Sequence, residues 1–348
     1  MTVIADLNSI KSLAFIRRQC WINLFIVIAL FGLLATQATA ASFDCSKAAS
    51  WVEKTVCANP ELSKLDEDLA KAYSDALASL SPEGQKETKQ YQKQWPKELS
   101  HIKDENSGAD NGLLAILLKI AYEERIQELK QSLIKFPDHI FRNVHVMHLE
   151  TKKKCPREII TKKLTYPQME NQRDKNEKFQ NTLIFQKASD DFKLDTGGEC
   201  TDVIVKYIVS FSNKHLISFQ GEQYYYVHGA AHGYSNRRSF SWLLEGNMEL
   251  QAADLFDDKT GWRKKLVALA SQKLKEQEVA DKESYEIKPS TLMDMVTSPS
   301  QWVISKGGLG FQFGEYDFGG RTTPFLITID WKTLDPFISK YGHSLISD

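Results

Sequence analysis

Two neighbouring stretches, DVIVKYIVSF at 202–211 and HLISFQGEQYYYVH at 215–228, decide the fold class of this chain. Val, Ile, Phe and Tyr are enriched in strands. Asn213 lies between the two stretches and Gly229 follows the second, and residues of these types commonly bound strands. We therefore expect two strands here, in a mostly antiparallel sheet.

The sequence around these strands continues the same pattern. Further short runs rich in strand-forming residues lie at 139–149, 159–167, 181–187, 238–244, 301–305, 309–314 and 324–330. Two helices are expected, one from Trp262 to about residue 278 with apolar residues on one face, and one from Trp331 to Tyr341. The polar stretch 168–180 is expected to be a surface loop or a short helix. Residues 136–348 thus predict an α+β domain with helices over a mostly antiparallel sheet.

Residues 41–135 predict a different architecture, a small all-α bundle. The sequence Asn59-Pro60-Glu61 favours a helix start, with Asn as the N-cap and Pro in the first turn. Apolar residues then recur at steps of three and four up to Leu80, as on one face of an amphipathic helix. Further helices are expected at about 46–57, 84–104 and 112–135.

Residues 1–40 have the features of a secretory signal peptide. Lys11, Arg17 and Arg18 precede the apolar run at 21–34, and Ala38-Thr39-Ala40 has the small-x-small pattern of a cleavage site. The run is shorter than the roughly 20 apolar residues of a spanning helix. We expect a periplasmic or secreted protein with no membrane span after cleavage; the alternative is an uncleaved anchor with the rest of the chain outside.

Cleavage removes Cys20 and leaves four cysteines, an even number that suits an oxidising compartment. Three pairings are possible, and proximity in the chain favours Cys45–Cys57 and Cys155–Cys200. A zinc site is the alternative, but the sequence contains no C-x-x-C pair. The 44 basic and 45 acidic residues balance, which argues against a nucleic-acid binder.

The first domain contains Phe43-x-Cys45, Glu53 followed by Cys57, and a characteristic spacing from Leu62 to Asp66. In these residues it resembles the LprI-type lysozyme inhibitors, over about 90 residues. A Gln-Trp pair at 94–95 and the segment 122–129 are similar to later parts of the family pattern. The resemblance implies lysozyme inhibition as the activity of this domain.

The second domain contains Gly229-Ala230-Ala231-His232-Gly233, together with Tyr166-Pro167, Asn181 and Tyr316. In these residues, of which 229–233 are the best marker, it resembles the extracellular domain shared by the RsiV anti-sigma factor and the PdaC deacetylase. In RsiV this domain is a lysozyme receptor, and in PdaC it accompanies a separate catalytic domain. The resemblance implies binding of lysozyme. We expect no deacetylase activity, because no polysaccharide-deacetylase domain follows in this sequence.

No group of residues in the sequence predicts catalysis, a metal site or a cofactor. His228 and His232 surround glycine and alanine, so we interpret them as loop histidines that bind the backbone at a tight turn. Glu315 and Asp317 are interpreted as acids on a solvated strand end, and a hydrolase pair is the alternative. Gly233-Tyr234-Ser235-Asn236-Arg237 lacks the closing glycine of a nucleophile elbow.

We therefore expect a non-enzymatic envelope protein that binds, and inhibits or senses, a lysozyme-type muramidase. The candidate contact residues are Asn59 and Glu61 in the first domain and Tyr234 and Asn236 in the second. Two alternatives stay open. One is a protein that binds cell-wall glycan, with peptidoglycan as partner, or an accessory to a peptidoglycan-modifying enzyme; the other is a structural envelope protein without a ligand.

Overall fold

The structure, a computed structural model, describes residues 41–106, 108–170, 172–193, 200–281, 287–314, 317 and 325–347. The expected signal peptide at 1–40, and Glu315 and Tyr316, lie outside these residues. The chain divides into two compact units, one ending at Ala70 and the other beginning at Lys71. The predicted domain boundary between 135 and 136 stays a prediction.

The first unit is built from short helices. These are the 3₁₀ helix η1 (Cys45–Lys47), α2 (Trp51–Ala58) and the first turns of α3 (Pro60–Ser79). Ser50 and Glu53 form a capping box at the start of α2, which satisfies two free backbone N–H groups at that end. The disulfide Cys45–Cys57 joins η1 to the last turn of α2. Asp66 accepts hydrogen bonds from the backbone and side chain of Ser42, at 2.7 and 2.6 Å.

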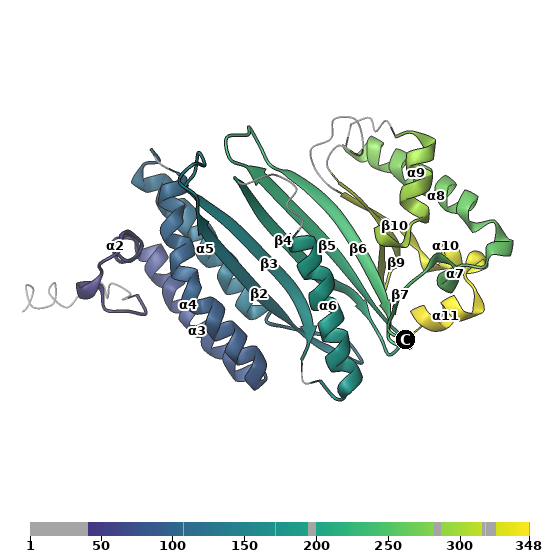
Figure 1. The fold of residues 1–348 in the computed structure, drawn as a ribbon, viewed down its shortest axis with the longest axis horizontal. Helices are drawn as coiled ribbons and strands as arrows, with labels where there is room; N and C mark the ends of the chain where they lie inside the picture. The colour runs from purple at the N-terminus through teal and green to yellow at the C-terminus, as the bar shows by residue number, and fades with distance from the viewer. Residues whose placement is uncertain are drawn as a thin grey trace, which may run out of the picture. The chain divides into compact units, whose positions relative to one another are not determined.

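The second unit contains a seven-stranded sheet whose strand order follows the chain, from β1 to β7. All neighbours are antiparallel except β3 and β4, and helix α6 (Lys175–Lys193) makes the crossover between these two parallel strands. Helices α4 (Pro82–Glu105) and α5 (Asn111–Lys130) precede the sheet, and α4 packs on β2 (Figure 1). The strands are β1 (Leu133–Lys135), β2 (Ile140–Thr151), β3 (Ile159–Met169), β4 (Thr201–Ser212), β5 (Leu216–Val227), β6 (Tyr234–Leu243) and β7 (Met248–Glu249).

A smaller antiparallel sheet, in the order β10-β9-β8, completes the second unit. Its core includes stacked Phe256 and Trp262, with Trp302 edge-on to both rings. Its strands are β8 (Trp302–Ser305), β9 (Gly308–Phe313) and β10 (Phe325–Asp330). The helices around it are α7 (Ala252–Leu255), η2 (Asp258–Thr260), α8 (Trp262–Asp281), α9 (Pro289–Thr297), η3 (Pro299–Gln301), α10 (Trp331–Leu334), η4 (Asp335–Phe337) and α11 (Lys340–Ile346).

The two faces of the large sheet are covered by different elements. Val203, Val205 and Tyr207 of β4 share a core with Ile184 and Ala188 of α6, which crosses in front of the central strands in Figure 1. Side chains alternate along a strand, so the residues between them face the other way. On that opposite face β8 packs on β4, β5 and β6.

The predicted fold class is confirmed: a disulfide-linked helical region precedes an α+β region with a mostly antiparallel sheet. The strand expected at 181–187 is wrong, because these residues belong to α6. Its apolar run is short, and a short run fits either period. The buried side chains of Asn181, Ile184 and Ala188 are three and four residues apart, as on one helix face.

Two expected helices also differ from the structure. The helix expected at 331–341 is broken into α10, η4 and α11, since Pro336 lacks the N–H that a continuous helix needs. The helix expected to end at 135 ends at Lys130, and β1 follows it. Among the helices that the structure describes, none is long and apolar enough to cross a membrane.

Candidate functional site

The candidate binding surface of the second unit is the hairpin that joins β5 to β6. Gly229 has φ +92°, a conformation that a residue with a side chain rarely adopts. The backbone N–H of Ala230 donates to the carbonyl of Val227 at 3.0 Å, and the Tyr226 hydroxyl donates to the carbonyl of Ala230 at 3.3 Å. A side chain on Gly233 would meet the Tyr224 ring at 2.4 Å. These contacts fix the turn in one conformation and leave Ala230, Ala231 and His232 exposed.

The base of the hairpin is tied to two other segments. His228 is buried, and its Nδ1 lies 3.1 Å from the carbonyl oxygen of Arg157, while its Nε2 lies 3.1 Å from Oδ1 of Asp202. Its backbone N–H donates to the carbonyl of Cys200 at 2.9 Å. The disulfide Cys155–Cys200, the second of the two pairs that proximity favours, joins the same segments. The contacts of His228 and the disulfide Cys155–Cys200 therefore hold the base of the hairpin in place.

Tyr234 and Asn236 lie two residues apart on β6, on the same face, and both are exposed. The ring of Tyr234 is 37% exposed and stacks on the buried ring of Tyr225, with centroids 5.1 Å apart. An aromatic ring that is held by a neighbour loses little conformational freedom when a partner covers its open face. The structure thus places both predicted residues on one accessible strand beside the turn.

The two predicted contact residues of the first unit have a different setting. The side-chain oxygen of Asn59 accepts hydrogen bonds from the backbone N–H groups of Glu61 and Leu62, at 2.9 and 3.3 Å. Asn59 therefore caps α3, and this structural role explains why an asparagine stands at this position. Glu61 is exposed in the first turn of the same helix, where a negative charge is favourable.

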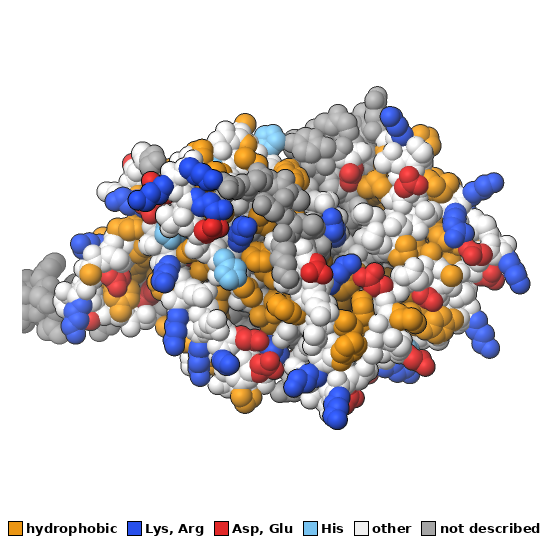
Figure 2. Space-filling view, viewed as in Figure 1, with side chains coloured by type: hydrophobic (Ala, Val, Ile, Leu, Met, Phe, Trp, Pro, Cys, Tyr) orange, Lys and Arg blue, Asp and Glu red, His pale blue; other side chains and the backbone are white. Residues whose placement is uncertain are grey.

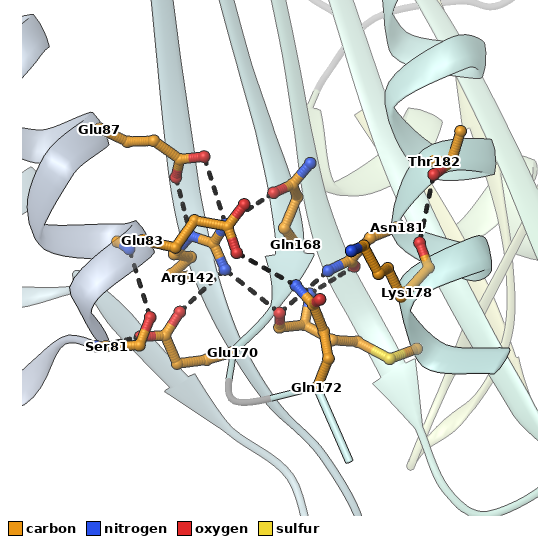
Figure 3. Close-up of polar contacts among 12 residues, drawn as sticks. Ser81, Glu83, Glu87, Arg142, Gln168, Glu170, Gln172, Lys178, Asn181 and Thr182 are labelled. Atoms are coloured by element: carbon orange, nitrogen blue, oxygen red, sulfur yellow. Dashed lines mark hydrogen bonds and ion pairs between the residues drawn. The ribbon is translucent and has the colours of Figure 1, made fainter. Parts of the chain in front are cut away.

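A buried ion cluster around Arg142 on β2 was not foreseen from the sequence (Figure 3). Its guanidinium lies 2.8 Å from Glu87 of α4 and 2.9 Å from Glu170, which follows β3. Glu170 also accepts a hydrogen bond from the backbone N–H of Ser81. Burial alone lowers the pKa of Arg142, but the hydrogen bonds and charges of Glu87 and Glu170 raise it above its ordinary value. The cluster clamps the start of α4 to the sheet, and the sequence signal for it is a single arginine within a strand.

The motif residues Tyr166, Pro167 and Asn181 lie near this cluster and have structural contacts. The side-chain amide of Asn181 accepts from the backbone N–H of Met169 at 2.8 Å and donates to its carbonyl at 3.0 Å (Figure 3). Pro167 pairs with Asn143 in the sheet, and the buried Tyr166 ring packs near Phe185 of α6. Asn181 therefore fixes the end of β3 to α6, and none of the three lines the hairpin.

The other residues considered for chemistry are separated. Nδ1 of His232 lies 2.8 Å from the carbonyl oxygen of Gly233. Asp317 accepts a hydrogen bond from the backbone N–H of Gly314 at 2.6 Å, and burial raises the pKa of its carboxyl. Within the described ranges, no three His, Cys, Asp or Glu side chains gather in a group that suits a metal ion. On the face in Figure 2, basic and acidic side chains alternate without a large area of one sign.

Comparison with known proteins identifies no family for this chain. No protein-family model matches the sequence, and no curated protein matches it. A DUF3298 family protein from Pseudomonas aeruginosa PAO1 is similar in structure, with 12% identity and a TM-score of 0.38, over 58% of this chain and 94% of that one. A DUF3298 family member from Bacteroides fragilis NCTC 9343 has 15% identity and a TM-score of 0.37, over 58% of this chain and 94% of that one.

Proposed function

We propose that this chain is an exported envelope protein that binds a lysozyme-type muramidase and thereby inhibits or senses it. The observation that carries the proposal is the β5–β6 hairpin, a hydrogen-bonded turn with Tyr234 exposed beside it. Two disulfides support export, because such bonds persist in oxidising compartments. The sequence resemblance of residues 229–233 to a lysozyme receptor domain supports the choice of partner.

The hairpin has features of a protein-binding surface. Tyr is one of the residue types that contribute most to binding energy when a partner covers them. Tyr234 already stacks on Tyr225, so a partner can add contact area without first ordering the ring. The neighbouring Asn236 is exposed and adds a side-chain amide that can donate and accept hydrogen bonds.

The net charge of residues 41–135 supports fast association with a basic lysozyme more than it supports high affinity. Residues 41–135 carry thirteen basic and sixteen acidic residues, a net charge of −3. Many lysozymes are basic, so attraction speeds association and weakens with salt. Buried anchors at the centre of the contact must supply most of the affinity, and we assign that part to Tyr234.

The test is calorimetric titration of residues 41–348 against several types of lysozyme, at low and at moderate salt. We expect binding tighter than about 100 μM, or about −5.5 kcal/mol, for at least one lysozyme type. Tyr234→Ala should weaken that binding by tenfold or more, which is the size of a strong anchor contribution. Tyr341→Ala is the matched control, because Tyr341 is a similarly exposed tyrosine on α11.

Two results count against the proposal. One is the absence of binding tighter than about 100 μM to every lysozyme type tested. The other is equal weakening by Tyr234→Ala and Tyr341→Ala, which removes the hairpin from the contact. A turbidity assay with the same variants then separates inhibition of the muramidase from binding without inhibition.

A further inference from the structure

A cavity of about 590 Å³ lies between helices α4 and α5 and the face of the sheet opposite α6. Ile204, Lys206 and Ile208 of β4 form its floor, and these alternate with the β4 residues that pack on α6. Ile204 and Ile208 are each 38% exposed, unusual for isoleucines in the middle of a central strand. The volume is in the range of small-molecule sites.

Arg125 of α5 lines this cavity and is only 2% exposed. Its Nη1 lies 2.9 Å from Oε2 of Glu128, its Nε donates to Gln92 at 3.1 Å, and its guanidinium lies over the Tyr91 ring. Its Nη2 is buried without a hydrogen-bond partner in the part of the chain that the structure describes. A buried donor on a charged group costs free energy when it is unpaired, so this atom calls for an acceptor.

A second unpaired atom lies at the same cavity. Oδ1 of Asn143, on β2, is buried and has no hydrogen-bond donor among the described residues. Asn143 lines the cavity together with Arg125. Two residues of the cavity wall therefore each carry a buried polar atom without a partner, beside a partly apolar floor.

The charges around the cavity argue against a strongly anionic ligand. Its acidic lining residues are Glu98, Glu123, Glu124 and Glu128. Its basic lining residues are Arg125, Lys163 and Lys206, of which Arg125 pairs with Glu128 and Lys163 with Glu98. His145 lines the cavity too, and burial lowers its pKa to about 4, so the ring is neutral at pH 7. No excess of positive charge remains for a phosphate or sulfate group.

We propose that this cavity binds a neutral small ligand that carries a secondary amide. Both atoms are covered in this structure, so ligand binding moves the side chains of Arg125 and Asn143. The amide carbonyl then accepts from Nη2 of Arg125, the amide N–H donates to Oδ1 of Asn143, and apolar groups of the ligand lie on Ile204 and Ile208. N-acetylated sugars and short peptides share this chemistry. The site is independent of the hairpin, because none of its residues belongs to β5, β6 or the turn between them.

The experiment is an NMR titration of ¹⁵N-labelled residues 41–348 with N-acetylglucosamine, with its trimer and with the blocked dipeptide N-acetyl-alanyl-alanine amide. Glucose, which lacks the amide, is the control ligand. We expect saturable shifts at the backbone amides of Thr165 and Lys206, with a dissociation constant on the order of 1 mM or tighter for one amide ligand. The sugar and peptide arms decide which source of the amide the cavity prefers.

Two variants connect the shifts to the cavity. Asn143→Leu removes the acceptor at nearly constant volume and should weaken binding by about tenfold. Ile204→Arg places a long side chain on the floor and should abolish binding, and the partial exposure of Ile204 makes the substitution compatible with folding. Asn111→Leu, at the exposed first residue of α5 and outside the cavity lining, should leave binding unchanged.

Three outcomes overturn the proposal. The first is the absence of a saturable shift up to about 10 mM of any amide ligand. The second is equal binding of glucose and N-acetylglucosamine, and the third is an equal effect of Asn143→Leu and Asn111→Leu. Failure of the hairpin proposal leaves this result untouched, since the muramidase titration changes Tyr234 and this one changes Asn143 and Ile204.

Discussion

Nη1 of Arg142 lies 2.9 Å from Oε2 of Glu170, and both side chains are almost fully buried. The pair joins the second strand of the sheet to the end of the third. Taking two charges out of water is costly, and their attraction offsets that cost only while both are present.

Removal of one member of this pair should therefore destabilise the protein strongly. We expect Arg142→Met to lower the free energy of unfolding by about 3–5 kcal/mol, because Glu170 stays buried without its main counter-ion. Urea unfolding followed by circular dichroism measures the change. The double variant Arg142→Met/Glu170→Leu should lose less than the two single variants added together. Glu83→Gln is the control, since Glu83 is 59% exposed and 3.7 Å from Arg142, and it should cost less than about 1 kcal/mol.

Gly221 on β5 has no room for a side chain. A Cβ atom there would lie 2.2 Å from the ring of Tyr207, which is buried on the neighbouring strand. Gly221→Ala should cost about 1–3 kcal/mol of stability through overpacking. Gly307→Ala should cost less, because a Cβ atom there would lie 3.9 Å from the Ser305 hydroxyl oxygen, an ordinary van der Waals distance. Equal losses in thermal unfolding of the two variants would show that the contact with Tyr207 is unimportant.

Acid should weaken the fold through His145. Burial lowers the pKa of His145 to about 4, whereas a histidine in an unfolded chain titrates near 6.5. Between these values the unfolded state binds the proton and the folded state does not, so stability is complete above about pH 6.5 and falls as the pH drops toward 4. The slope from this group is at most about 1.4 kcal/mol per pH unit.

The variant His145→Gln isolates that contribution. Urea unfolding at pH 7, 6, 5 and 4 should show a smaller loss of stability on acidification in the variant than in the parent chain. His139, whose pKa burial also lowers, remains in both proteins and cancels in the comparison. Parallel pH profiles would contradict the assignment of the acid sensitivity to His145.

The two disulfides should differ in what they contribute. The Cys155–Cys200 bridge spans 45 positions and the Cys45–Cys57 bridge spans 12. The chain-entropy relation assigns about 4 kcal/mol to the longer loop and about 3 kcal/mol to the shorter one. Unfolding of Cys155→Ala/Cys200→Ala and Cys45→Ala/Cys57→Ala measures both. The first pair should also loosen the hairpin, which amide hydrogen exchange at residues 228–233 detects, while the second pair leaves that exchange unchanged.

The mature N-terminus tests the expected export. The basic residues, the apolar run and Ala38-Thr39-Ala40 predict cleavage before Ala41. Mass spectrometry of protein from the envelope fraction should find the chain starting at Ala41 or within a residue or two of it. A product that starts at Met1 would refute cleavage and favour the uncleaved anchor.

The local sequence pattern was sufficient to predict most of the strands. Residues 202–211 and 215–228 carry strand-forming side chains bounded by turn residues, and both form strands close to the expected limits. It failed at 181–187, where a short apolar run fits a strand and a buried helix equally well. The helix there is selected by packing: Ile184 and Ala188 fit the core over β4, and Asn181 reaches the backbone of Met169. That choice depends on residues distant in the chain.

The sequence by itself determined the α+β class, the order of a helical region before the sheet, and the favoured cysteine pairing, because each follows from periodicity, composition or chain proximity. Only the tertiary structure decided which residues distant in the chain are in contact. Arg142 meets Glu87 and Glu170, and His228 meets Asp202 and Arg157, across 26 to 71 positions. The unpaired Nη2 of Arg125 and Oδ1 of Asn143 share a cavity for the same reason. Whether a buried polar atom has a hydrogen-bond partner depends on which atoms folding brings next to it. The local sequence pattern does not contain that information.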